Sequence, residues 1–326
     1  MNTEAKCAFS IQNNFLLALL PSTSVLYVHT CSSIMGKKGK KAQAGKPKKL
    51  TPKDVGKSLD TLAKKCEEEL KGADLFAPLP PTEDCAICLV PVFRLNSQTC
   101  YKACCGKTIC VACVIGNKEC IDKQNEEKNA GKKIAFTCPF CREPVPTDME
   151  YNSQLQGRCL LNDHQAFELM GGLYLRGEHG IAKDDLKALD YHIRAIELGS
   201  PSACISIGHR YSEGIGVAVD EERVALFLRI GALRGDIQAR YNIGVHEHKS
   251  GNHEIGIRHW KISAEAGDQD SLNLLKEIYN ADGKLPGKEF ITKDYLDFAH
   301  RACCEAQEEV KSEEREKHSG RSTEGL

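Results

Sequence analysis

The cysteines of this 326-residue chain are concentrated in one short stretch. Ten of the 17 cysteines fall within the 57 residues 85–141. Six of them form three Cys-x-x-Cys pairs, namely Cys85 with Cys88, Cys110 with Cys113, and Cys138 with Cys141. A two-residue spacer lets a tight turn direct both thiolates at one tetrahedral ion, so the spacing predicts zinc sites. Disulfides are the alternative, but no other part of the chain is typical of a secreted protein, in which such thiols would be oxidised.

The order and spacing of these cysteines resemble a RING finger, a small zinc-stabilised α+β module. In that family the first and third ligand pairs hold one zinc ion, and the second and fourth pairs hold another. The resemblance therefore implies two zinc ions in a module over residues 82–147. The first ion would be bound by Cys85, Cys88, Cys110 and Cys113. The second would be bound by Cys104, Cys105, Cys138 and Cys141.

The second ligand set departs from the commonest RING pattern, which includes a histidine, because residues 85–141 contain none. If Cys105 took the third-ligand place, Lys107 would stand where the histidine belongs, and an ammonium group has no lone pair to give a metal. A known all-cysteine RING variant has its fourth ligand five residues before the fifth, as Cys105 stands before Cys110, and Cys104 is then the nearest third ligand. Adjacent ligands are tighter than usual, so Cys100 stays open as a substitute for Cys104.

The resemblance also implies a docking site for a ubiquitin-conjugating enzyme. In RING-type ubiquitin ligases, the positions that match Ile87, Pro139 and Phe140 form a shallow apolar patch that grips this enzyme. The basic residue that matches Arg142 hydrogen-bonds to the enzyme and to its ubiquitin. Such a ligase forms no covalent intermediate and instead holds the thioester where a substrate lysine can attack it. Many active members have a tryptophan where this chain has Asn117, so a non-enzymatic zinc-stabilised scaffold or adaptor is the alternative.

From about residue 150 the sequence repeats itself. Similar blocks begin at Ala166, Ala203, Ala239 and Ser271, at steps of 37, 36 and 32 residues. A period in the thirties is typical of an α-solenoid built from helix pairs. Over residues 150–310, the residue pattern of the copies resembles Sel-one-like repeats, which are related to the tetratricopeptide class. The resemblance implies an all-α solenoid that binds a target or partner protein.

Three glycines stand at the same place in the first three copies, namely Gly171, Gly208 and Gly244. Because glycine has no Cβ, each is predicted to let the two helices of its pair approach closely. A last helix after Ile291 is predicted to turn Phe298 inward, together with Tyr295 and Ala302.

Residues 51–76 are predicted to contain an amphipathic helix. Thr51 offers a capping hydroxyl, Pro52 suits the first helical position, and apolar residues follow at three- and four-residue steps until Gly72. Such an apolar stripe needs a partner. The zinc module, the downstream helices and a second copy of the chain all remain open as that partner.

Both ends of the chain are predicted to lack a fold. Seven lysines and no acidic residue lie between Lys37 and Lys49, so residues 1–50 are expected to be a disordered basic extension, with Met35 as the true start. This extension is interpreted either as a nuclear-import or polyanion-binding tail or as a solubilising tail. Residues 311–326 are expected to be a charged flexible tail.

The overall charge and the apolar content do not point to a particular class of partner. The net charge of −1 and the apolar content of 41% indicate neither a membrane nor nucleic acid as a partner. The expected partners are therefore a ubiquitin-conjugating enzyme and a substrate or partner protein on the repeats. Because zinc-binding thiols must stay reduced, we expect the cytoplasm or the nucleus as the location.

Overall fold

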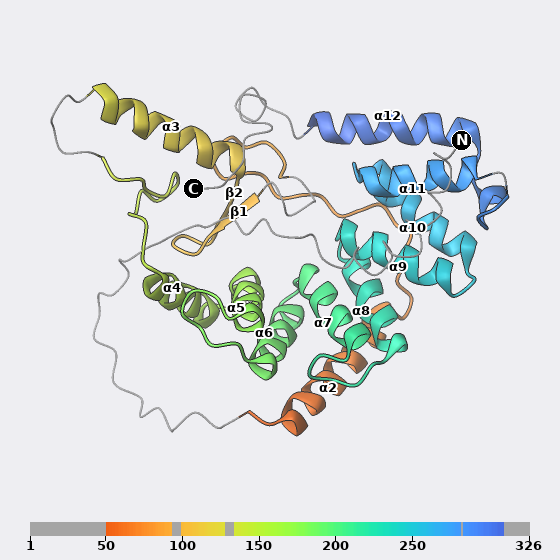
Figure 1. The fold of residues 1–326 in the computed structure, drawn as a ribbon, viewed down its shortest axis with the longest axis horizontal. Coiled ribbons are helices and arrows are strands. Elements are labelled where there is room, and N and C mark those ends of the chain that lie inside the picture. The colour runs from red at the N-terminus through yellow and green to blue at the C-terminus, as the bar shows by residue number, and fades with distance from the viewer. Residues whose placement is uncertain (1–49, 93–98, 128–133, 282, 310–326) are drawn as a thin grey trace, which may run out of the picture.

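The computed structural model describes residues 50–92, 99–127, 134–281 and 283–309 (Figure 1). The predicted basic extension, the expected start at Met35 and the predicted tail over residues 311–326 lie outside the described residues. Figure 1 shows a long row of helices, with a cysteine-rich module (residues 82–147) beside its beginning. Among the described residues, no helix combines the length and the apolar character that crossing a membrane requires.

Helix α2 (Pro52–Leu70) begins as its sequence predicts and ends before residue 76. The backbone N–H of Asp54 donates to the Thr51 hydroxyl at 3.2 Å, and the Asp54 carboxylate accepts from the Thr51 N–H at 3.3 Å. This reciprocal capping satisfies donors that the first turn of a helix leaves open. Lys71 caps the other end, and Gly72 follows with φ of +77°, a left-handed conformation that glycine adopts without strain.

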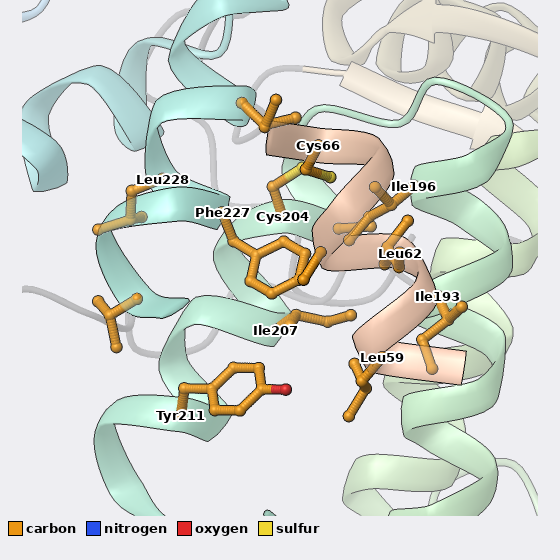
Figure 2. Close-up of a cluster of buried hydrophobic side chains, with 14 of the residues drawn as sticks. Leu59, Leu62, Cys66, Ile193, Ile196, Cys204, Ile207, Tyr211, Phe227 and Leu228 are labelled. Carbon is orange, nitrogen blue, oxygen red and sulfur yellow. The ribbon is translucent and has the colours of Figure 1, made fainter. Parts of the chain in front are cut away.

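The apolar stripe of α2 packs on the downstream helices α6 (Asp185–Glu197) and α8 (Glu221–Leu233) (Figure 2). Its buried residues are Val55, Leu59, Leu62, Ala63 and Cys66. Three ion pairs flank this contact: Lys65 with Glu197, Arg223 with Asp60, and Arg234 with Glu69. Of the three partners that the sequence left open, the downstream helices are the ones that cover the stripe.

In its described residues, the cysteine-rich module has one hairpin and one helix. Strand β1 (Thr99–Lys102) pairs with β2 (Lys107–Cys110) in an antiparallel register that sets Thr99 opposite Cys110 and Lys102 opposite Lys107. Helix α3 (Val111–Glu127) follows β2 directly. The described part of the module therefore combines a short antiparallel hairpin with a helix.

The remaining helices form a solenoid in which each packs on the next. Helix α4 (Asp148–Leu160) leads into four helix pairs. The pairs are α5 (His164–Arg176) with α6, α7 (Ser202–Glu213) with α8, α9 (Ile237–Lys249) with α10 (His253–Glu265), and α11 (Gln269–Asn280) with α12 (Lys293–Glu309). A short 3-10 helix, η2 (Lys288–Phe290), joins the last pair. The predicted helix pairs are thus present in the predicted order.

The repeat glycines differ from one another, contrary to the sequence prediction. A Cβ on Gly171 would lie 2.4 Å from the His192 ring, and one on Gly244 would lie 2.6 Å from the indole nitrogen of Trp260. These two glycines permit close approach. A Cβ on Gly208 would meet nothing nearer than Leu228 at 3.7 Å, which is an ordinary van der Waals contact. The prediction for Gly208 is therefore wrong, because the second pair of helices leaves room for a methyl group there.

The last helix turns a different face inward from the one expected. Leu296, Ala299 and Cys303 of α12 are buried, whereas the Phe298 side chain is 48% exposed. Tyr295 is partly buried and packs against the same core cluster. The predicted inward position of Phe298 is wrong because the neighbouring helices α10 and α11 select the 296–299–303 face.

Candidate metal centres

The first Cys-x-x-Cys pair lies on a tight backbone turn. The N–H of Cys85 donates to the Val90 carbonyl at 2.9 Å, and the N–H of Leu89 donates to the Cys85 carbonyl at 3.0 Å. Leu89 has φ of +55°, which reverses the chain directly after Cys88. The turn therefore brings both thiols of the pair to one side, as a two-residue spacer allows.

The last pair lies on a turn of the same form. The N–H of Cys138 donates to the Glu143 carbonyl, and the N–H of Arg142 donates to the Cys138 carbonyl, both at 2.8 Å. Arg142 has φ of +62°, so it takes the place that Leu89 takes in the first turn. Two sequence-distant turns thus share one backbone geometry, and each carries a pair of cysteines.

Four thiols gather at each of two places. The first group consists of Cys85, Cys88, Cys110 and Cys113. Within it, sulfur–sulfur distances of 3.9 Å join Cys85 to Cys113 and Cys88 to Cys110. Four sulfurs about 2.3 Å from a zinc ion would lie about 3.8 Å apart, whereas a disulfide joins its sulfurs at about 2 Å. The spacing suits a tetrahedral metal ion and excludes a disulfide between these partners.

The second group consists of Cys104, Cys105, Cys138 and Cys141. The sulfur atoms of the adjacent pair, Cys104 and Cys105, lie 3.7 Å apart, so neighbouring residues can serve one site here. Cys100 does not join this group. It stands opposite Ile109 in the hairpin and is buried in a core cluster with Cys85, Cys110 and Cys113. The structure thus brings together the two ligand sets that the RING resemblance implies, with Cys104 rather than Cys100 in the second.

The thiols of the second group differ in pKa. Hydrogen bonds to Cys105 and Cys138 raise the pKa of Cys104, whereas hydrogen bonds from Cys104 and Cys105 lower the pKa of Cys138. One sulfur is thereby favoured as a thiolate among protonated neighbours. A divalent cation would take the place of these protons and let every sulfur bind as a thiolate. The donor set therefore fits a thiophilic metal ion at each place.

A buried lysine lies beside the second group and was not anticipated from the sequence. The Lys102 side chain is 1% exposed, and burial lowers its pKa, while the thiols of Cys100 and Cys138 act in the opposite direction. A buried ammonium group is costly unless an anionic partner compensates it. Four thiolates around a divalent cation carry net negative charge, so a metal-loaded second site would supply that partner.

The predicted docking residues lie on the two turns. Ile87 of the first turn and Phe140 of the second are 40% and 44% exposed. Arg142 is exposed, and Pro139 is partly buried. Asn117, which stands where many active members have tryptophan, donates from its side chain to the Thr137 carbonyl at 3.0 Å. The apolar side chains on the turns are thus available to a partner, and Asn117 braces the second turn from α3.

The hairpin of the module is fixed to the first repeat. The Tyr101 hydroxyl donates to the Asp163 carboxylate at 2.5 Å, and the Thr108 hydroxyl donates to the Gln165 side-chain oxygen at 3.0 Å. Arg158 of α4 donates to the Ala103 carbonyl at 3.1 Å. Beneath these bonds lies a shared buried cluster of Ala103, Tyr151, Leu155, Ala166, Met170 and Leu173. This contact positions both thiol groups relative to the repeats, and no motif in the sequence marks it.

Comparisons with known proteins concern the repeats. No protein-family model matches the chain. Over 131 residues the chain is 26% identical to a Sel-one-like repeat-containing protein of Acanthamoeba polyphaga mimivirus, and the match covers 40% of this chain. The same match covers only 22% of the viral protein, so the chain spans about a fifth of that relative's length. The match supports the Sel-one-like interpretation of the repeats.

Two solved structures are also similar to this chain. One is a Sel-one repeat protein from Oxalobacter formigenes, with 27% identity and a TM-score of 0.39, covering 47% of this chain and 64% of that one. The other is a protective antigen of uropathogenic Escherichia coli strains that displays an SLR fold. Its identity is 21% and its TM-score 0.43, and the match covers 50% of this chain and 35% of that one.

Proposed function

We propose that the cysteine-rich module is a RING-type zinc module and that the protein is a ubiquitin ligase. The observation that carries the proposal is the interleaving of the two thiol groups. The first and third ligand pairs meet at one place, and the second and fourth meet at the other. A chain that crosses itself in this way holds the two turns at residues 85–89 and 138–142 in fixed positions.

Zinc is the metal that this donor set favours. All-thiolate tetrahedral sites suit zinc, and closed sites with four protein ligands are structural rather than catalytic. Cys85, Cys88, Cys110 and Cys113 would hold one ion. Cys104, Cys105, Cys138 and Cys141 would hold the other. The ions would stabilise a module too small to fold on apolar burial alone.

The module's own residues would bind and orient the conjugating enzyme. Ile87 and Phe140 offer exposed apolar side chains on two rigid turns, with Pro139 beside Phe140. Arg142 follows on the second turn, and its planar guanidinium can donate to two acceptors at once without losing its charge. A ligase of this kind accelerates transfer by orientation, because it removes the freedom of the thioester to point away from the attacking lysine.

The helical repeats would bind the target or a partner protein. A solenoid of helix pairs presents an extended surface along which a second protein can lie. The hairpin contacts with α4 and α5 would then hold that protein at a set distance from the docked conjugating enzyme. The substrate itself is not defined by the repeat pattern.

The test is discharge of ubiquitin from a panel of charged conjugating enzymes onto free lysine, with the whole chain present. We expect the zinc-loaded protein to accelerate discharge, and Ile87→Ala and Arg142→Ala each to reduce the acceleration at least about tenfold, or about 1.4 kcal/mol. Alanine at 142 introduces no new backbone strain, because arginine already adopts φ of +62° there.

Met149→Ala is the matched control. It removes an apolar side chain that is 79% exposed, and Met149 lies on α4 outside the proposed docking surface. It should therefore leave discharge unchanged. Zinc content is measured for every variant. If fully zinc-loaded protein accelerates discharge with none of the enzymes, the ligase proposal is rejected.

A non-enzymatic scaffold is the second candidate. Asn117 favours it, because this residue is already engaged with the Thr137 carbonyl and offers no indole to a conjugating enzyme. In that case the zinc module would fold and dock, and the repeats would hold the partner. Binding of a partner without any acceleration of discharge is the result that this candidate predicts.

A further inference from the structure

The hairpin of the cysteine-rich module carries one buried and one exposed lysine at paired positions. Lys102 is 1% exposed, whereas Lys107, which stands opposite it in the register of β1 and β2, is exposed. Lysine is almost never fully buried unless a partner compensates its charge. Among the described residues, no carboxylate forms an ion pair with Lys102. The compensating negative charge must therefore come from another kind of group.

Strand β1 directs the Lys102 side chain into the module. Successive side chains of a strand point to opposite faces. Tyr101 faces the repeats, where its hydroxyl bonds to Asp163, while Cys100 and Lys102 are buried on the other face. Cys100 packs in the core cluster that contains cysteines of the first thiol group. Lys102 thus extends from the face of β1 that is turned toward the thiols.

The turn after β1 carries two cysteines of the second thiol group past the same lysine. The N–H of Cys105 donates to the Lys102 carbonyl at 3.2 Å, and the N–H of Gly106 donates to it at 2.8 Å. Gly106 has φ of +64°, which closes the turn. Cys104 and Cys105 therefore lie in a tight turn that begins at Lys102.

The thiols that act on the charge of Lys102 belong mainly to the second group. Burial lowers the pKa of Lys102, and Cys100, Cys138, Cys104 and Cys105 act in the opposite direction. Burial also raises the pKa of Cys100, which makes this thiol a poor source of negative charge. The other three are ligands of the second group, which become thiolates when a metal ion replaces their protons.

A site made only of thiolates has more negative charge to compensate than a site with an imidazole. Zinc with four thiolates carries an excess of two negative charges, whereas zinc with three thiolates and a neutral imidazole carries one. The second ligand set contains no histidine. One ammonium group beside its four thiolates restores the net charge of the imidazole-containing site.

We propose that Lys102 is the charge partner of the second thiol group and that its ammonium group stabilises the metal-bound thiolates. The inference rests on the proposed zinc module and names a residue outside the ligand set on which metal binding at one site depends. Lys102 is a positioning residue, because an ammonium group has no lone pair for a metal and acts only through the ligands. Groups just outside the ligands typically contribute about 10–100-fold to metal affinity.

The test is removal of zinc from the full-length chain by EDTA, followed separately at each thiol group. Zinc-loaded protein is equilibrated with increasing EDTA, treated briefly with N-ethylmaleimide and digested with trypsin. Mass spectrometry then gives the EDTA concentration at which the peptides containing Cys85 and Cys138 are half modified. Lys102→Met keeps a long apolar side chain and removes the charge. We expect it to lower this concentration at least about tenfold for Cys138 and less than about twofold for Cys85.

Two further variants separate charge from packing. Lys107→Met is the matched control, because it removes the exposed lysine that stands opposite Lys102, and it should leave both groups unchanged. Lys102→Arg keeps a positive charge and should lose less zinc affinity at the second group than Lys102→Met.

An unshifted Cys138 in Lys102→Met would overturn the inference while leaving the zinc module intact. Equal shifts at Cys85 and Cys138 would show a general loss of packing, and an equal loss in Lys102→Arg would show that the charge is not what matters; either result would overturn it as well. If metal analysis of the unaltered chain finds no zinc at the second group, the inference and the proposed zinc module fail together.

Discussion

Two glycines that occupy the same place in neighbouring repeats should respond to alanine in opposite directions. Gly208 lies in α7 and Gly244 in α9. A Cβ on Gly208 has room, with Leu228 at 3.7 Å. A Cβ on Gly244 would lie 2.6 Å from the indole nitrogen of Trp260 and 3.1 Å from the carbonyl oxygen of Gly256. The first substitution is therefore accommodated, and the second requires atoms to move.

The difference in stability follows from these contacts. Alanine is favoured over glycine inside a helix by about 1 kcal/mol, and this gain applies to both sites. At Gly244 overpacking costs about 1–3 kcal/mol. The Trp260 indole also donates to the Tyr241 carbonyl at 3.1 Å, and displacing it costs about 1 kcal/mol more. Because the helix gain cancels, Gly208→Ala should be more stable than Gly244→Ala by about 2–4 kcal/mol.

Urea unfolding of the full chain, followed by far-UV circular dichroism, measures this difference. Gly208→Ala should raise the midpoint and Gly244→Ala should lower it. Trp260 is the chain's single tryptophan, so its fluorescence reports separately on the region around Gly244. Equal shifts for the two variants, or a lower midpoint for Gly208→Ala, would refute the argument from Cβ contacts.

Three further outcomes are expected. Cys138→Ser should remove one of two zinc ions and leave the other, as metal analysis would show; retention of both ions would contradict the ligand assignment. Burial lowers the pKa of His259 to about 4, so between about pH 4 and 6.5 the unfolded chain binds the proton more readily and stability falls as the pH falls. At pH 5 this loss is about 2 kcal/mol, and His259→Gln should remove it when urea midpoints at pH 7.5 and 5 are compared; an unchanged pH dependence would contradict the assignment. Leu59→Ala should weaken the packing of α2 by about 2–5 kcal/mol, measured as faster amide exchange in α2 than in α10; equal protection would contradict a local effect.

The helix pairs were predictable from sequence because their signals are local. The small and aromatic residues that mark each copy recur at a period in the thirties, and each copy can be recognised without knowledge of its neighbours. The structure contains the helices of these copies in the order that the sequence predicts. Gly208 and Phe298 were predicted wrongly because the space beside a residue depends on the neighbouring helix. Likewise, the apolar stripe of α2 required a partner, but only the folded chain shows that α6 and α8 provide it.

In the thiol groups, too, the features that depend on neighbouring residues were predictable, and those that depend on strand pairing were not. Two-residue spacers predict the turns at Cys85 and Cys138, whereas the choice between Cys100 and Cys104 depends on the hairpin register. That register puts Cys100 opposite Ile109 in the core. The burial of Lys102 could not be predicted from the sequence either, because lysine side chains are rarely fully buried.

The hairpin gives the protein a property that neither half has alone. Cys110 ends β2 and belongs to the first thiol group, while Tyr101 and Thr108 of the same hairpin bond to Asp163 and Gln165 at the start of the first repeat. A partner held on the repeats is therefore placed relative to the two turns by a packed contact. A flexible tether would only raise the local concentration of the two bound proteins, whereas a packed contact also fixes their orientation. If the module is a ligase, this contact limits which lysines of a bound target can meet the thioester.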